Sequence, residues 1–107
     1  MIRLTVRPAA ERDLVDGQTW YSRQDGALAD EFVDELRATL RRVREMPLQF
    51  PEVGGARRAL LHRFSYAVYF VLPDDDRAIV VAILHQSRTP TIWKRRIQTG
   101  DAGQTGR

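Results

Sequence analysis

Residues 66–84 read YAVYFVLPDDDRAIVVAIL, and this stretch decides the fold. It contains two nearly continuous apolar runs, residues 66–72 and 78–84, rich in the β-branched and aromatic side chains typical of strands. The proline and three aspartates at 73–76 separate the runs and predict a hairpin turn. Since each run is apolar on both of its faces, we expect two antiparallel strands covered on both sides. Tyr66 and Tyr69 are an odd number of positions apart, so they are expected on opposite faces.

Two amphipathic helices precede this hairpin along the chain. Pro8 suits the first turn of a helix, residues 24–26 are a turn signal, and Pro47 ends the second helix. The apolar stripe of the second helix consists of Leu28, Phe32, Leu36, Leu40 and Val43. The sequence therefore predicts a helical hairpin, and we expect Trp20 and Tyr21 of its first helix to be core or helix-packing residues.

The predicted order of elements is β-α-α-β-β-β, an α+β fold in which the helical hairpin packs on a small, mainly antiparallel sheet. Residues 2–7 alternate apolar and polar side chains and predict the first strand. Residues 47–55 are expected to form a loop, and residues 57–64 the strand that follows it. We expect residues 1–97 to form one domain and the small, polar residues 98–107 to form a disordered tail.

The predicted helical hairpin can cover only one face of the sheet. The last apolar residues, Ile92, Trp93 and Ile97, predict no more than a short helical turn. We therefore expect the second face to be covered by a dimer mate, a partner protein or a curled edge of the sheet. A sheet face left open in this way also predicts a chain that is poorly soluble without its partner.

The composition limits the chemistry available to the chain. Its 107 residues have room for one hydrophobic core. The absence of cysteine excludes disulfides and zinc–thiolate sites, and with only two histidines we expect neither a metal nor a cofactor. No apolar run approaches the roughly 20 residues that a membrane helix needs. We expect a cytoplasmic protein with no membrane contact.

Positive charge is concentrated in the second half of the chain. Residues 1–53 carry eight Lys or Arg and ten Asp or Glu, whereas residues 54–97 carry eight Lys or Arg and three aspartates. A basic surface of this kind attracts nucleic acid or an acidic protein segment. The competing interpretation is an ordinary solvated face.

Four stretches, taken together in this order and spacing, resemble the RelE/ParE toxins of type II toxin–antitoxin systems along residues 2–96. The first is RPAAERDL at 7–14 followed by Trp20-Tyr21, and the second is FVDEL at 32–36 followed by Pro47 and FPEV at 50–53. The third is RRALL at 57–61 followed by Phe64, Tyr66, Val68 and Tyr69, and the fourth is His85-Gln86, Arg88, Pro90 and Trp93.

The superfamily contains two mechanisms, and the residues favour the ParE type. RelE-like members are ribosome-dependent messenger-RNA endonucleases, whereas ParE-like members inhibit DNA gyrase. Attack by a 2′-hydroxyl needs a base, an acid and cations near the phosphorane. The first arginine position of RelE-like enzymes is Ala67 here, the second matches Arg88, and the C-terminal tyrosine position falls at Trp93 or Lys94. The resemblance therefore implies a non-enzymatic, ParE-like gyrase inhibitor that a cognate antitoxin neutralises.

Two other functions stay open at this point. A RelE-like endonuclease acting on messenger RNA at the ribosome would use Arg88 and His85, with His62 as a further candidate acid or base. The alternative for His85 is a strand cap held by hydrogen bonds, and for His62 it is a surface position. The third possibility is a binding module that has lost its toxicity.

The predicted target-binding residues are cations of the second half and one aromatic side chain. They are Arg57, Arg58, Arg63, Arg88, Trp93, Lys94, Arg95 and Arg96. In a docking surface the charges would steer encounter with an anionic target, and the indole would be a desolvated anchor. The competing interpretation is that Trp93 packs on the sheet while the cations keep the chain end soluble.

Overall fold

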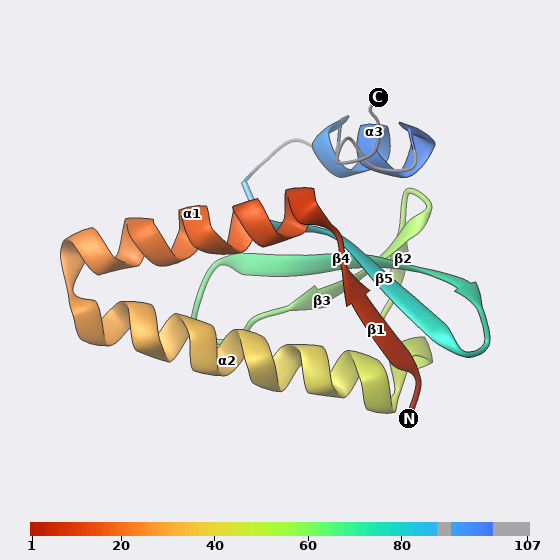
Figure 1. Ribbon diagram of the computed structural model, residues 1–107, viewed down its shortest axis with the longest axis horizontal. Helices are drawn as coiled ribbons and strands as arrows, with labels where there is room; N and C mark the ends of the chain where they lie inside the picture. The colour runs from red at the N-terminus through yellow and green to blue at the C-terminus, as the bar shows by residue number, and fades with distance from the viewer. Residues whose placement is uncertain (88–90, 100–107) are drawn as a thin grey trace.

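The computed structural model describes residues 1–87 and 91–99, and in them a five-stranded sheet lies between a helical hairpin and a third helix (Figure 1). Its elements are β1 (Arg3–Val6), α1 (Pro8–Gln24), α2 (Gly26–Glu45), the 3-10 turn η1 (Pro47–Gln49), β2 (Glu52–Val53), β3 (Ala56–Leu60), β4 (Tyr66–Asp74), β5 (Arg77–His85) and α3 (Thr91–Thr99). The predicted α+β class, a helical hairpin packed on a mainly antiparallel sheet, is confirmed.

The strands lie in the order β1-β5-β4-β3-β2, with β1 parallel to β5 and the other neighbours antiparallel. The ladder between β4 and β5 pairs Tyr69 with Ala82 and Phe70 with Val80. Val81 is therefore an extra residue in β5, which makes a β-bulge. After a bulge, the residues whose backbone N–H and C=O groups face a given edge of the strand shift by one position. The bulge therefore determines which backbone groups of β5 face the edge next to β1.

The hairpin turn between β4 and β5 lies where the sequence predicts it and is shorter than residues 73–76. Asp74 pairs with Arg77, so Asp75 and Asp76 form the turn between the strands. The Asp74 carboxylate accepts the N–H of Asp76 at 2.9 Å and forms an ion pair with Arg77 at 3.0 Å. These hydrogen bonds, the backbone one foremost, lower the pKa of Asp74 below its ordinary value.

The core between the helical hairpin and the sheet is built around Phe32. This side chain is fully buried, and its ring lies 5.1–5.5 Å from the rings of Tyr21, Phe64 and Tyr66. Burial raises the pKa of the Tyr21 phenol. The predicted stripe of α2 is confirmed, because Phe32, Leu36 and Val43 are buried and Leu28 and Leu40 pack against them.

Trp20 does not lie in this core, and that prediction is wrong. Its side chain is 57% exposed, whereas Tyr21 packs inside as predicted. Adjacent residues on a helix point about 100° apart, so one narrow contact with the sheet cannot bury both.

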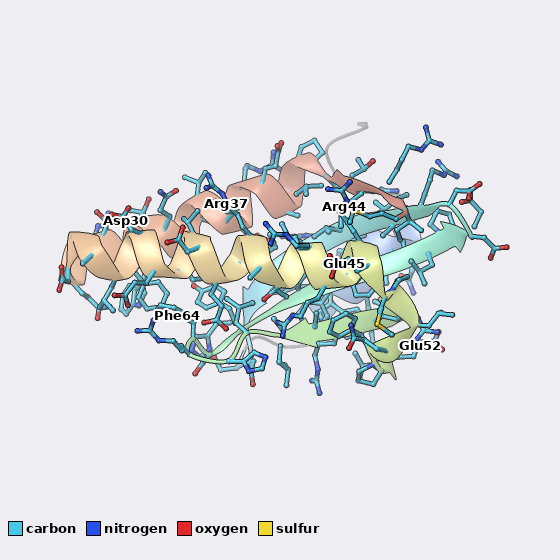
Figure 2. The ribbon with its side chains drawn as sticks, turned by 90° about the horizontal axis from the view of Figure 1, so that it is seen from below. Asp30, Arg37, Arg44, Glu45, Glu52 and Phe64 are labelled. Atoms are coloured by element: carbon cyan, nitrogen blue, oxygen red, sulfur yellow. The ribbon has the colours of Figure 1, made fainter. Side chains whose placement is uncertain are left out.

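The outer surface of α2 is polar. Asp30, Arg37, Arg44 and Glu45 lie along the helix on its exposed side, opposite the buried stripe (Figure 2). Within the described residues, no helix is both long enough and apolar enough to cross a membrane.

The second face of the sheet is covered by the chain itself, which corrects the expectation of an outside cover. The segment predicted as a short turn is α3 (Figure 1). Its inward side chains pack on the other apolar face of the sheet. The side chains buried there are Ala56, Ala67, Tyr69, Val81, Ala82, Leu84 and Trp93. Tyr66 and Tyr69 lie on opposite faces, as predicted. Because α3 covers this face, an open face no longer predicts poor solubility.

Three predicted boundaries differ from the structure. The loop at 47–55 contains η1 and β2, and the strand predicted at 57–64 ends at Leu60. Beyond Leu60 the chain forms a loop in which Leu61 and Phe64 remain buried, so their apolar character reflects the core rather than a strand. Helix α3 continues through Thr99 and so includes the first two residues of the predicted tail, 98 and 99, while residues 100–107 lie outside the described residues.

Gly17 on α1 tests how tightly the hairpin packs on the sheet. A Cβ at this position would lie 2.9 Å from Cζ of Phe32 and 3.3 Å from Tyr66. We expect Gly17→Ala to destabilise the chain by about 1–2 kcal/mol, because overpacking outweighs the better helix propensity of alanine. Urea unfolding measures the change. Gly26→Ala is the matched control, since a Cβ at Gly26 meets no atom within 4 Å. Equal effects of the two substitutions would show that the packing argument is wrong.

Candidate target-docking surface at the C-terminal helix

Trp93 holds α3 against the sheet. It is 4% exposed and stacks on Tyr69 of β4, with ring centroids 5.0 Å apart and 15° between the ring planes. The β2–β3 turn closes over the same ring. Gly54 in that turn has a φ of 61°, and a Cβ there would lie 2.7 Å from Trp93. This left-handed position against the indole therefore requires glycine.

One edge of β5 continues past the end of β1. The short strand β1 pairs with residues 77–80, and the last bond in line joins Arg7 N–H to the Val80 carbonyl at 3.0 Å. Beyond the bulge, the Val81 carbonyl and the Ile83 N–H face this edge, where no strand is available. Buried backbone groups of this kind need hydrogen-bond partners from elsewhere.

Asp13 of α1 and Arg96 of α3 supply those partners. The Asp13 carboxylate accepts the Ile83 N–H at 3.0 Å, and Nη1 of Arg96 donates to the Val81 carbonyl at 2.9 Å. The two side chains also bind each other through both carboxylate oxygens, at 2.6 and 3.2 Å. With 9% and 19% of their side chains exposed, they form a largely buried, two-point ion pair. The pair joins α1, β5 and α3 at one point.

The role of Asp13 was not predicted from the sequence. A signal was present, because Ala9, Ala10, Asp13 and Gly17 follow helical spacing and all four are buried on one side of α1. A carboxylate on the apolar side of a helix needs a partner. What the spacing could not reveal is that the partner lies 83 positions further along the chain.

Helix α3 presents two cations outward and keeps one inward. Lys94 and Arg95 are exposed, whereas Arg96 is in the buried pair with Asp13. Trp93 was predicted to be an anchor for the target. It is instead packed on the sheet, as the competing interpretation of this residue stated. Arg88 lies outside the described residues.

The remaining predicted cations do not join Lys94 and Arg95 in one patch. Arg57 donates to the Phe50 carbonyl at 2.7 Å, and Arg63 pairs with Glu31 of α2 at 2.7 Å. Arg58 lines a groove at the outer edge of β3. The predicted cations that the structure describes are therefore distributed over separate parts of the molecule, and α3 carries the outward pair.

Both histidines have hydrogen-bonded positions. Nδ1 of His85 accepts the Ser87 N–H at 3.1 Å and lies 2.8 Å from the Ser87 hydroxyl, which is the cap that the sequence offered as an alternative to catalysis. Nε2 of His62 accepts from Arg42 at 2.9 Å, since a guanidinium can only donate. His62 is exposed. Among residues 1–87 and 91–99, no cluster of His, Asp and Glu could hold a metal ion.

Comparison with known proteins assigns most of the chain to a family. The sequence model of the family described as "ParE toxin of type II toxin-antitoxin system, parDE" matches residues 4–90, which is most of the chain. The chain belongs to the ParE toxin family. Membership in this family implies a cognate antitoxin as partner.

A solved ParDE structure is similar to this ParE-family chain. It is described as "Chromosomal ParDE TA system from P. aeruginosa", and one of its chains matches with a TM-score of 0.68 and 20% identity. The match covers 79% of this chain and 96% of that chain, and at this identity it supports the fold. None of the curated protein sequences compared matches the chain.

Removing Arg96 from this ParE-family chain tests the buried pair. We expect Arg96→Met to lower the free energy of unfolding by about 2 kcal/mol, because Asp13 is then left buried without its cation. Arg37→Met removes an exposed arginine of α2 (Figure 2) and should change stability by no more than about 0.5 kcal/mol. Urea unfolding of both variants gives the comparison. A loss in Arg96→Met no larger than in Arg37→Met would contradict the role given to the pair.

Proposed function

We propose that this ParE-family toxin inhibits DNA gyrase in the cytoplasm and is neutralised by its cognate antitoxin, and that it does not cut messenger RNA. One observation carries the choice between the two mechanisms. Ala67 occupies the position at which RelE-like ribonucleases place an arginine, and it is fully buried in the cluster that α3 closes.

A ribonuclease needs cations and an acid–base pair that RNA can reach. Here the sheet face beside Ala67 is covered by the indole of Trp93, so a phosphate cannot approach it. Nδ1 of His85 already accepts a hydrogen bond from the Ser87 N–H. These contacts support a toxin that acts by docking on another protein.

Lys94 and Arg95 are the best-placed docking residues. Trp93 and Arg96 are one turn apart and hold α3 against the sheet, so the two cations between them face outward. Charges held on a fixed helix steer the approach of an anionic partner more effectively than charges on a flexible chain terminus.

Induced expression in bacteria decides between the candidate functions. Gyrase inhibition predicts gyrase–DNA adducts and DNA damage, with messages intact. Codon-specific cuts in translated messages that disappear in His85→Ala would establish the ribonuclease instead. Unimpaired growth, with folded chain present in the cell, would show that the toxicity has been lost.

Charge reversal on α3 tests the docking surface. We expect Lys94→Glu combined with Arg95→Glu to abolish toxicity, while stability changes by only about 0.5 kcal/mol per site because both side chains are exposed. Growth after induction and thermal unfolding measure the two effects. The matched control is Arg37→Glu with Arg41→Glu on the exposed side of α2. A folded α3 variant that stays fully toxic would place the docking surface elsewhere.

A further inference from the structure

The β2–β3 turn beside α3 is as short as a hairpin turn can be. Val53 pairs with Ala56, so Gly54 and Gly55 alone connect the two strands. Their φ angles are 61° and 92°, and a type I′ turn requires positive φ at both central positions. Such a turn has no spare residue, and the paired residues on each side fix its place. Gly54 therefore has one defined position next to α3 (Figure 1).

Gly54 contacts Lys94 as well as Trp93. A Cβ at Gly54 would overlap Cε of Lys94 and would lie 3.2 Å from its Nζ, besides its clash with the indole. The Lys94 ammonium lies 5.7 Å from the centroid of the Trp93 ring, within the range of a cation–π contact. The end of the lysine stem thus lies against the glycine backbone, and its charge lies over the indole.

Lys94 is restrained without being neutralised. Arg63, Arg77 and Arg96 are each held by a carboxylate of this chain. Lys94 is exposed and makes no ion pair within residues 1–87 and 91–99. A lysine has many rotamers, and fixing one of them on binding costs conformational entropy. An ammonium that is already ordered and still lacks an acid is therefore well prepared to bind an anion from outside.

We propose that Gly54 is a positioning residue of the docking surface: it keeps the Lys94 ammonium over the Trp93 indole, where that ammonium binds an acidic group of the target protein. The inference rests on the proposed function in that the target docks at α3. A side chain at position 54 would displace the lysine stem, and docking would weaken although the charge of Lys94 is retained.

The competing explanation is that glycine is needed at position 54 only because Trp93 packs beneath it. In that case the place of Lys94 is incidental, and a change at position 54 acts through the packing of α3. The two explanations differ in whether positions 54 and 94 are energetically coupled during docking.

Nuclear Overhauser spectra of the purified chain test the place of Lys94 without any target. One Hα of Gly54 points where a Cβ would stand, so it should show an Overhauser effect to the ε-methylene protons of Lys94. The Hα protons of Gly55 should show none, because a Cβ there meets no atom within 4 Å. An effect from Gly54 to Trp93 without one to Lys94 would show that the lysine moves freely, and would overturn the proposal.

A double-mutant cycle tests whether Gly54 acts through Lys94. The measured quantity is the cellular toxin level at half-maximal growth inhibition, from immunoblots of induced cells. Lys94→Met removes the charge and keeps an unbranched stem, and should raise this level about tenfold. Gly54→Ala should raise it about fivefold while Lys94 is present and less than about twofold in the Lys94→Met background. Equal factors in the two backgrounds would show a purely structural role and overturn the proposal.

Gly55→Ala is the matched control for backbone strain. It also places alanine at a positive φ, but its Cβ enters open space. After correction for the folded fraction by thermal unfolding, it should leave the required toxin level unchanged. A rise as large as that of Gly54→Ala would assign the effect to strain and refute the positioning role. Should Gly54→Ala not fold, full toxicity of Lys94→Met would refute it instead.

A failure of this inference is distinguishable from a failure of the proposed function. The Overhauser effect needs no target, and growth inhibition is measured whichever target the toxin has. A toxic chain that forms no gyrase–DNA adducts would refute gyrase inhibition, while the coupling between Gly54 and Lys94 would still decide the positioning role.

Discussion

The buried pair of Asp13 and Arg96 is the contact on which the architecture depends. The strand β1 is shorter than β5, so the Val81 carbonyl and the Ile83 N–H would be left without partners at the edge of the sheet. The carboxylate and the guanidinium bond to these two groups and to each other. A strand edge is thus completed by side chains from α1 and α3. Because the arginine belongs to α3, completion of the edge also fixes that helix over the second face.

The two edges of the sheet end differently, and the proposed function follows that difference. On the β1 side the chain satisfies its own backbone, and the adjoining face is closed by Trp93 and Tyr69. The closed face holds α3 in place, with Lys94 and Arg95 on its exposed side. On the β3 side, the Nε atoms of Arg42 and Arg58 are buried and make no hydrogen bond among the described residues.

Much of this fold could be predicted from local pattern. The hairpin at 66–84 and the stripe of α2 depend on periodicity, which reflects burial directly. The cover of the second face could not be predicted, because α3 is short and its three apolar residues suit a free turn equally well. The partner of Asp13 was also hidden, since a contact over 83 positions leaves no trace in local spacing. Trp93 illustrates the same limit. Its position among cations suggested an anchor on the surface, whereas in the structure its side chain is buried against Tyr69.

The most direct test of this account is the solvent exposure of Trp93. The chain has two tryptophans, so the Trp20→Phe variant leaves Trp93 as the only indole that fluoresces. Acrylamide quenching of that variant should be weak, because Trp93 is 4% exposed. Adding Asp13→Asn weakens the ion pair, and quenching should then rise toward that of an exposed indole while the far-ultraviolet spectrum keeps its helix and strand signal. If Trp93 remains equally shielded in the folded double variant, the pair does not hold α3 in place.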